Sequence, residues 1–171
     1  MPYTSAEEFI SALTRTFARF RPRTVRDTSE KGRPVLQMVI PNEVHPRYSL
    51  SVEVTEYGPD RLVSLWFGQT EITSRLPEDD AAAAITEFLE DRMVTVVRYK
   101  NRDAHDDRHP MERARVYQLP IEGEEGQEPS ELDRLLERLD APATWLDRLL
   151  GRDTGVFEIA RWSDVRVVER K

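Results

Sequence analysis

The feature that most constrains the fold of this chain is a run of alternating residues near its middle, followed at once by an amphipathic helix. In residues 48–55 apolar and polar side chains alternate, as they do in a strand that is buried on one face. Residues 62–67 are apolar apart from Ser64, which favours a central strand buried on both faces. A third alternating segment, residues 72–76, ends at Pro77, because proline cannot donate a hydrogen bond to a neighbouring strand. Together these segments predict an antiparallel β-meander.

The helix after the meander is predicted from its charges and its spacing. Glu78, Asp79 and Asp80 stand where a helix N-terminus favours negative charge. Apolar residues at helical spacing follow and form one stripe, which should cover the apolar face of the sheet. The core is therefore expected to contain Leu50, Val52, Val54, Leu65, Phe67, Ile85, Phe88 and Leu89.

The fold class predicted for the whole chain is α+β, with an antiparallel β-sheet, helices packed on one face and a C-terminal helical hairpin insertion. Ser5 and Glu8 form a capping box at the start of a first helix, which Pro22 ends. Residues 27–34 are expected to be a loop and residues 101–110 a charged turn. Further strands are expected at residues 35–40, 93–99, 113–119, 156–159 and 165–168.

At 171 residues the chain is expected to form a single α+β domain, residues 1–171. Residues 121–129 read IEGEEGQEP, and this glycine, proline and glutamate content predicts an acidic flexible linker. Residues 130–151 are predicted to form the helical insertion, in which Pro142 separates two leucine-rich helices.

The composition excludes several classes of function. A net charge of −7 argues against nucleic-acid binding, which requires a basic face. The arginine-rich residues 15–33 are interpreted as a solvated surface, although an anion site there stays open. The chain has no cysteine, so thiol catalysis and cysteine-based zinc sites are excluded. No apolar run reaches the length of a membrane span, and residues 1–5 lack signal-peptide features, so we expect a cytoplasmic protein without a membrane partner.

No recognised motif indicates a catalytic site. The sequence contains no nucleophile elbow, no P-loop and no dinucleotide-binding fingerprint, so we expect no enzyme, no catalytic residue and no cofactor. The alternative is a small metal-dependent hydrolase that uses the loop with His105 and His109, whose neighbours Asp103, Asp106 and Asp107 also suit divalent metals. Because the segment does not read as a helix, and metal-binding histidines need fixed hydrogen-bond partners, we predict no metal site.

The segment LVSLWFGQTE resembles part of a group of small bacterial proteins, several of which are regarded as immunity proteins of polymorphic toxin systems. Members carry a strand that ends in Phe-Gly, matched here by Phe67 and Gly68, and then a short motif with histidines. Gln69, Thr70 and Glu71 stand in place of those histidines, so a function tied to them does not carry over. The resemblance implies a non-catalytic protein-binding module that neutralises or escorts a specific partner.

The expected order of elements is also similar to the type III secretion chaperone fold. Those chaperones are small, acidic and non-enzymatic, and they wrap an unfolded segment of an effector protein. This second resemblance implies an extended partner bound along a dimer surface. It carries over no site residue, because it rests on topology alone.

The partner is expected to be a specific protein with a basic surface, because complementary charge steers association. The predicted partner-binding residues are Trp66, Gln69, Glu71 and Glu53 in the central hairpins, and Trp145 in the helical insertion. Both tryptophans are anchor candidates, since buried aromatic residues supply much of the affinity of interfaces. Ordinary core packing is the alternative for each. The identity of the partner and the oligomeric state, a homodimer included, stay open.

Overall fold

The chain folds into two compact units, residues 1–90 and 91–171, each with its own antiparallel sheet. The structure, a computed structural model, describes residues 3–28, 34–57, 60–108, 110–111, 114–119, 131–141 and 155–170. These residues contain nine strands and four α-helices, which confirms the α+β class. The prediction of a single domain, residues 1–171, stays a prediction. The described strands divide into two sheets, since β6 pairs with β7 and β8 and with no described strand of the first sheet.

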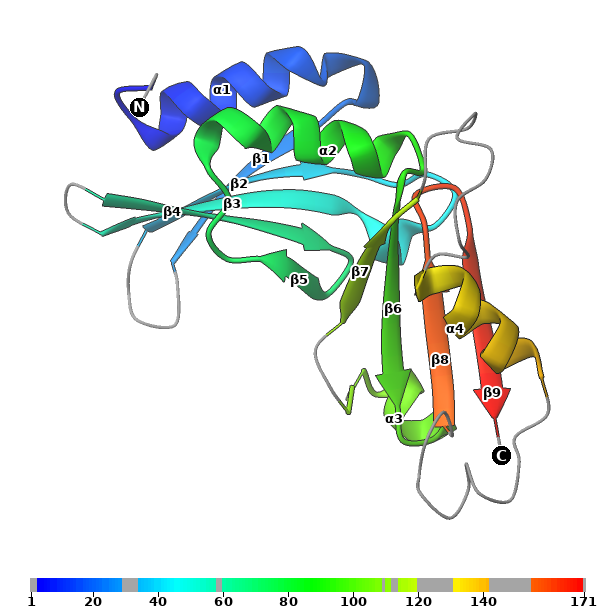
Figure 1. Cartoon of the computed structure of the whole chain (residues 1–171). Coiled ribbons are helices and arrows are strands. Elements are labelled where there is room, and N and C mark those ends of the chain that lie inside the picture. Colours follow the sequence, from blue (N-terminus) through cyan, green and yellow to red (C-terminus); the bar gives the residue numbers. More distant parts are fainter. Residues whose placement is uncertain are drawn as a thin grey trace. The chain divides into compact units, whose positions relative to one another are not determined.

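The first unit is built on a five-stranded sheet in which every strand pairs antiparallel with its neighbour in sequence (Figure 1). The strands are β1 (Arg23–Thr28), β2 (Pro34–Ile40), β3 (Leu50–Tyr57), β4 (Asp60–Phe67) and β5 (Thr70–Thr73). The predicted meander is confirmed as β3, β4 and β5. Strand β1 was not predicted, because it holds a single apolar residue, Val25, among polar ones and so lacks an apolar row.

Two α-helices, α1 (Ala6–Thr16) and α2 (Ala81–Leu89), lie on the same face of this sheet (Figure 1). The helix α1 begins as predicted, since Ser5 Oγ accepts from the Glu8 amide at 3.1 Å. The Glu8 carboxylate reaches back to the amide of Thr4, at 2.8 Å, and not to that of Ser5. Short 3-10 turns lie at η1 (Ala18–Phe20), η2 (Pro46–Tyr48) and η3 (Glu78–Asp80).

The predicted core of the first unit is buried between the sheet and these helices. The aromatic rings of Phe67 on β4 and Phe88 on α2 lie 5.2 Å apart at its centre. Every residue of the predicted core is buried except Leu89, which is half-buried at the last position of α2.

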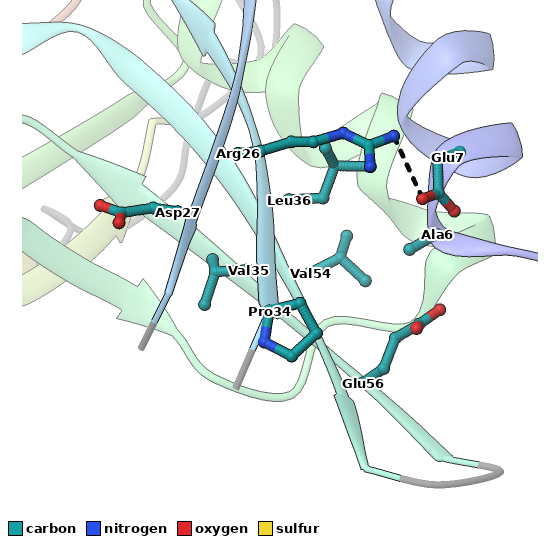
Figure 2. A pocket seen from close by; sticks show the side chains of 9 residues that line it. All are labelled: Ala6, Glu7, Arg26, Asp27, Pro34, Val35, Leu36, Val54 and Glu56. Carbon is teal, nitrogen blue, oxygen red and sulfur yellow. Dashed lines mark hydrogen bonds and ion pairs between the residues drawn. The ribbon is translucent and has the colours of Figure 1, made fainter. Parts of the chain in front are cut away.

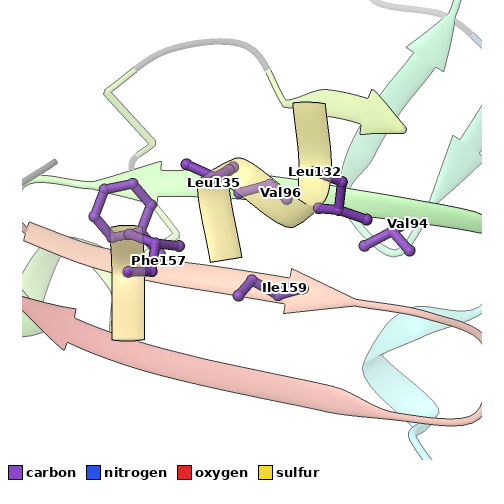
Figure 3. Packing of buried hydrophobic residues seen from close by; sticks show 7 residues of the cluster. Val94, Val96, Leu132, Leu135, Phe157 and Ile159 are labelled. Atoms are coloured by element: carbon purple, nitrogen blue, oxygen red, sulfur yellow. The ribbon is translucent and has the colours of Figure 1, made fainter. Parts of the chain in front are cut away.

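The second unit contains a four-stranded sheet in the order β7-β6-β8-β9. Its elements are β6 (Met93–Tyr99), α3 (Arg102–Asp106), β7 (Arg115–Gln118), α4 (Glu131–Asp140), β8 (Gly155–Ala160) and β9 (Val165–Arg170). Helix α4 covers one face of this sheet, where Leu132 and Leu135 pack on Val96, Phe157 and Ile159 (Figure 3). This helix is the first half of the predicted helical insertion. The second half, and the predicted linker at residues 121–129, lie outside the described residues.

The structure corrects the expectation that residues 101–110 form a turn without a helix. Helix α3 forms there, and the side chain of Asn101 caps it by accepting from the Ala104 amide at 2.9 Å. An asparagine cap of this kind satisfies one of the free amide groups at a helix start. Because most residues of this short helix are charged, they form no apolar stripe, and apolar periodicity could not predict the helix.

Candidate functional site

The candidate site lies on the face of the first sheet that faces away from α1 and α2, here called the open face (Figure 1). Because side chains alternate along a strand, Met38, Val52 and Leu65 point into the core while their neighbours point the other way. The open face is formed by Arg23, Val25, Asp27, Val35, Gln37, Val39, Ser51, Glu53, Thr55, Leu62, Ser64, Trp66 and Glu71. It combines aliphatic side chains with a tryptophan and several carboxylates.

The register of the sheet brings three of the predicted partner-binding residues together. Trp66 on β4 lies opposite Glu71 on β5 and opposite Ser51 on β3. Glu53 follows Ser51 by two residues and is therefore the diagonal neighbour of Trp66. Opposite side chains in a sheet lie about 5 Å apart and diagonal ones about 7–8 Å apart. Trp66, Glu53 and Glu71 thus form one cluster, here called the acidic tryptophan cluster.

The two remaining predicted residues do not join this cluster. Gln69 is exposed in the tight turn between β4 and β5, beside Gly68. Gly68 has φ of 61°, and a Cβ atom there would lie 2.8 Å from the carbonyl oxygen of Arg47. The geometry of the turn therefore explains the glycine that follows Phe67, since only glycine fits this turn without strain. Trp145 lies outside the described residues.

Gln37 on β2 is a member of the site that the sequence analysis did not single out. Its Nε2 donates to Glu53 Oε1 at 3.1 Å and to Ser51 Oγ at 3.2 Å. This amide holds the Glu53 carboxylate in place on the sheet. The alternation of β2, in which Gln37 stands between the apolar Leu36 and Met38, was the available signal. It could not show which β3 residue lies opposite.

The surroundings of Glu53 in this cluster shift its pKa. Burial raises the pKa of Glu53, the Trp66 indole opposes this shift, and the Glu71 carboxylate adds to it. In the part of the chain that the structure describes, neither Glu53 nor Glu71 forms an ion pair with a basic side chain. Trp66 Nε1 is buried and lies toward the Glu53 carboxylate, without the full geometry of a hydrogen bond among the described residues. The cluster therefore places two carboxylates beside one indole ring on the open face.

A second polar cluster lies in the second unit around the buried carboxylate of Glu158 on β8. Its Oε2 contacts His105 Nε2 at 2.9 Å and accepts from Arg108 Nη1. The other ring nitrogen of His105, Nδ1, lies 3.0 Å from Asp106 Oδ1. Ionised carboxylates only accept hydrogen bonds, so a His105 ring nitrogen that bears a proton donates to the carboxylate it contacts. The cluster connects α3 to the sheet through an internally paired set of charges.

Tyr99 on β6 completes this second cluster. Its hydroxyl accepts from Arg108 Nη1 at 3.2 Å, and its ring meets the His105 ring edge-on with centroids 5.0 Å apart. Burial raises the pKa of Tyr99, while the hydrogen bond from Arg108 opposes that shift. His105 and Asp106 were candidate metal ligands in the sequence, but Glu158 was not. Among the described residues no group of three or more suitable side chains could hold a metal, and His109 lies outside them.

The first unit also has a small pocket between the start of α1 and strands β1, β2 and β3 (Figure 2). Its volume is about 70 Å³, far below the roughly 300–1,000 Å³ of typical ligand sites. It is lined by Ala6, Glu7, Arg26, Asp27, Pro34, Val35, Leu36, Val54 and Glu56. Arg26, a member of the basic segment in the sequence, pairs here with Glu7 at 3.2 Å.

Comparisons with known protein families, with curated proteins and with solved structures find no match to this chain. None of the helices in the described ranges is long and apolar enough to cross a membrane.

Proposed function

We propose that this protein is a non-catalytic protein-binding module that recognises one specific partner, with a basic contact surface, through the open face of its first sheet. The observation that carries the proposal is the acidic tryptophan cluster: Trp66 is flanked by Glu53 and Glu71, neither of which has a cationic partner among the described residues. The expected biological role is that of an immunity-like protein, which neutralises or escorts its partner in the cytoplasm.

The physics of interfaces supports this choice of surface. A few aromatic anchors usually supply most of the affinity, while charges steer the encounter and exclude wrong partners. The open face offers both, because half-buried Trp66 stands beside the two carboxylates, and aliphatic Val39 lies two strands away, across Ser51. Both α-helices of the unit pack on the opposite face and support the sheet. The net charge of −7 agrees with a basic partner.

The contacts of His105 favour this proposal over the metal-dependent hydrolase. Its ring is buried, and both ring nitrogens already contact carboxylates of the same unit. A metal ligand or a catalytic base needs a ring nitrogen that is available to a metal or a substrate.

Site-specific photo-crosslinking in the source cell tests the proposal. A photoreactive amino acid in place of Thr55, on the open face, should crosslink one discrete protein, and the crosslinked peptide should be rich in Lys and Arg. The same amino acid in place of Ser11, exposed on α1, is the matched control for the helix-covered face. Crosslinking from Ser11 alone, or an acidic contact peptide, would contradict the proposal. A small-molecule turnover measured for the intact protein would contradict it as well.

A further inference from the structure

Strand β1 is an edge of the first sheet, where β2 is its neighbour among the described strands. It is six residues long, and its register with β2 runs from Arg23 to Thr28 without a shift. Val25, near its middle, is 43% exposed. The outer edge of a strand this long and regular presents a row of backbone N–H and C=O groups, which can pair with a further strand.

The charges of β1 are arranged symmetrically about Val25. Arg23 and Asp27 each stand two residues from it, on the same face of the sheet, and they carry opposite charges. Two identical strands that pair antiparallel are related by a two-fold axis. Opposite side chains lie on one face of a continuous sheet, so this axis lies between two copies of the same residue. When that residue is Val25, Arg23 of each copy lies opposite Asp27 of the other.

We infer that β1 is a self-association edge, through which two copies of this chain pair antiparallel with Val25 opposite Val25. The two five-stranded sheets then join into one continuous sheet. Two exposed valines meet at its centre, and a pair of Arg23 with Asp27 lies on each side of them. The two-fold axis is perpendicular to the sheet, so both open faces lie on the same side of it. The inference is independent of the proposed function.

Both charged residues are available for this pairing. Arg23 and Asp27 are exposed, so their charges are not taken from water at great cost when they meet. In the part of the chain that the structure describes, Arg23 forms no ion pair. Asp27 interacts within its own chain, and a carboxylate with two oxygens can accept from an arginine in addition.

The same charges disfavour the neighbouring registers of β1 on itself. With Arg26 at the axis, two arginines would lie opposite each other, and like charges in this position destabilise a strand pair. With Thr24 at the axis, only residues 23–25 of the two strands would face each other. Charged side chains on an edge strand usually prevent pairing. In β1 they instead select a second copy in one register.

The other edge strands of the two sheets do not match themselves in this way. Strands β5 and β7 have four residues each. Strand β9 has six, but a two-fold register centred on Val168 places Arg166 opposite Arg170. A register centred on Val167 forms no charge pair within the strand. Among the described edges, β1 therefore combines length with charges that complement a second copy.

Sedimentation equilibrium of the full chain tests the inference. Because the interface consists of one strand edge and two exposed ion pairs, we expect a dimer with a Kd of about 1–100 µM. Arg23→Asp and Asp27→Arg each convert both charge pairs into repulsive ones and should weaken association about tenfold or more. Arg75→Asp is the control, because it makes the same change of charge at an exposed residue after β5, and its Kd should stay within about twofold.

A mixture of the two charge variants provides the sharpest test. In a heterodimer of Arg23→Asp with Asp27→Arg, every aspartate at these positions faces an arginine again. The equimolar mixture should therefore associate with a Kd within about threefold of the unaltered protein, although neither variant associates well alone. Recovery in the mixture also shows that both variants are folded.

A cysteine at the axis tests the register. The chain has no cysteine, so Val25→Cys carries a single thiol. Opposite Cα atoms of antiparallel strands lie about 4.5–5.5 Å apart, within the range that a disulfide spans. Mild oxidation should therefore join two copies. Val167→Cys, at an exposed valine of the edge strand β9, is the control and should crosslink about tenfold more slowly or less.

A monomer at about 1 mM protein would overturn the inference, since the expected dimer is then saturated. Charge-reversal variants that associate like the unaltered protein, or folded variants whose mixture does not associate, would overturn the pairing of Arg23 with Asp27. Equal crosslinking from Val25→Cys and Val167→Cys would overturn the assignment to β1. If a charge variant does not fold, as judged by circular dichroism, the comparison of these two cysteine variants decides.

Discussion

Glu53 in the first unit and Glu158 in the second are both carboxylates on strands, and their surroundings are opposite. Glu158 is only 3% exposed, and a histidine and an arginine both contact its Oε2. Glu53 is half-buried and accepts a hydrogen bond from the neutral amide of Gln37. The Glu71 carboxylate lies nearby. A buried charge is stable when it is paired and costly when it is not.

On the proposed function, this difference separates a structural charge from one that a partner contacts. The contacts of Glu158 with His105 and Arg108 lie within the second unit and connect α3 to the sheet. Among the described residues, the carboxylates of Glu53 and Glu71 form no ion pair, and the proposed function assigns them to a basic partner. The predictions below test this comparison, from the largest expected effect to the smallest.

Loss of the Glu158 charge should produce the largest effect. Glu158→Gln removes the buried carboxylate charge that His105 and Arg108 both contact, and breaking such a set typically costs about 3–5 kcal/mol. Urea unfolding of the full chain, followed by circular dichroism, measures the loss. Asp106→Asn is the control, because the Asp106 side chain is 61% exposed and an exposed pair contributes about 1 kcal/mol or less. Equal losses in the two variants would contradict a structural role for Glu158.

The neighbours Phe67 and Trp66 test the two faces of the first sheet. Phe67→Ala should cost about 3–5 kcal/mol, because its ring is buried against Phe88 and leaves a cavity. Trp66→Ala should cost clearly less than that, since Trp66 is half-buried on the open face, yet it should remove partner binding. Thermal melts compare the stability losses of the two variants, and binding assays with the partner compare their affinities. A larger stability loss for Trp66→Ala would show that the indole is a core residue.

Association with the partner should slow as salt increases. Glu53 and Glu71 face solvent in part, and charges of this kind are screened beyond about 10 Å at 0.1 M salt. We expect an on-rate that falls about tenfold or more between low and high salt, as in electrostatically steered encounters. Surface-binding kinetics across a salt series measure it. The double variant Glu53→Gln, Glu71→Gln should flatten the dependence, and an unchanged slope would remove these residues from the encounter.

The smallest effect concerns the stability of the free protein. The pKa of Glu53 is raised in the folded state, so the folded protein binds a proton at this site more readily than the unfolded chain. The ionised form therefore lowers stability above the folded-state pKa, and this cost disappears as the pH falls below about 4, where both states are protonated. Glu53→Gln should accordingly raise Tm slightly at pH 7 and leave it unchanged at acid pH. A lower Tm at pH 7 would show that Glu53 is already stabilised.

The alternation of β3 was sufficient to predict its two faces, whereas β4 was predicted to be buried on both faces and keeps Leu62 and Trp66 half-buried on the open face. Val52 and Leu65 were assigned to the core, and both are buried; Glu53 and Trp66 were assigned to a binding surface, and both project from the open face. Local periodicity contains this information because a side chain's face depends only on its position in the strand. The same argument predicted α2 from its acidic start and its apolar stripe.

Short polar elements were harder to predict. Strand β1 has no apolar row, and its place is set by pairing along the whole of β2, from Arg23 opposite Val39 to Thr28 opposite Pro34. Helix α3 is held by the Asn101 cap and by His105, which meets Glu158 at a separation of 53 residues. Neither the pairing of β1 with β2 nor the contact of His105 with Glu158 produces a periodic pattern in the local sequence.

The sequence by itself determined the α+β class, the meander and its helix, the absence of thiol chemistry and the acidic character of the chain. Only the tertiary structure decided that the strands divide into two sheets, that Glu71 lies opposite Trp66 with Glu53 on the diagonal, and that Glu158 meets His105 and Arg108. The physical reason is the sequence separation over which each kind of interaction acts. Alternation, capping and turn formation act between residues a few positions apart, whereas register and charge pairing depend on backbone hydrogen bonds and burial that join distant segments.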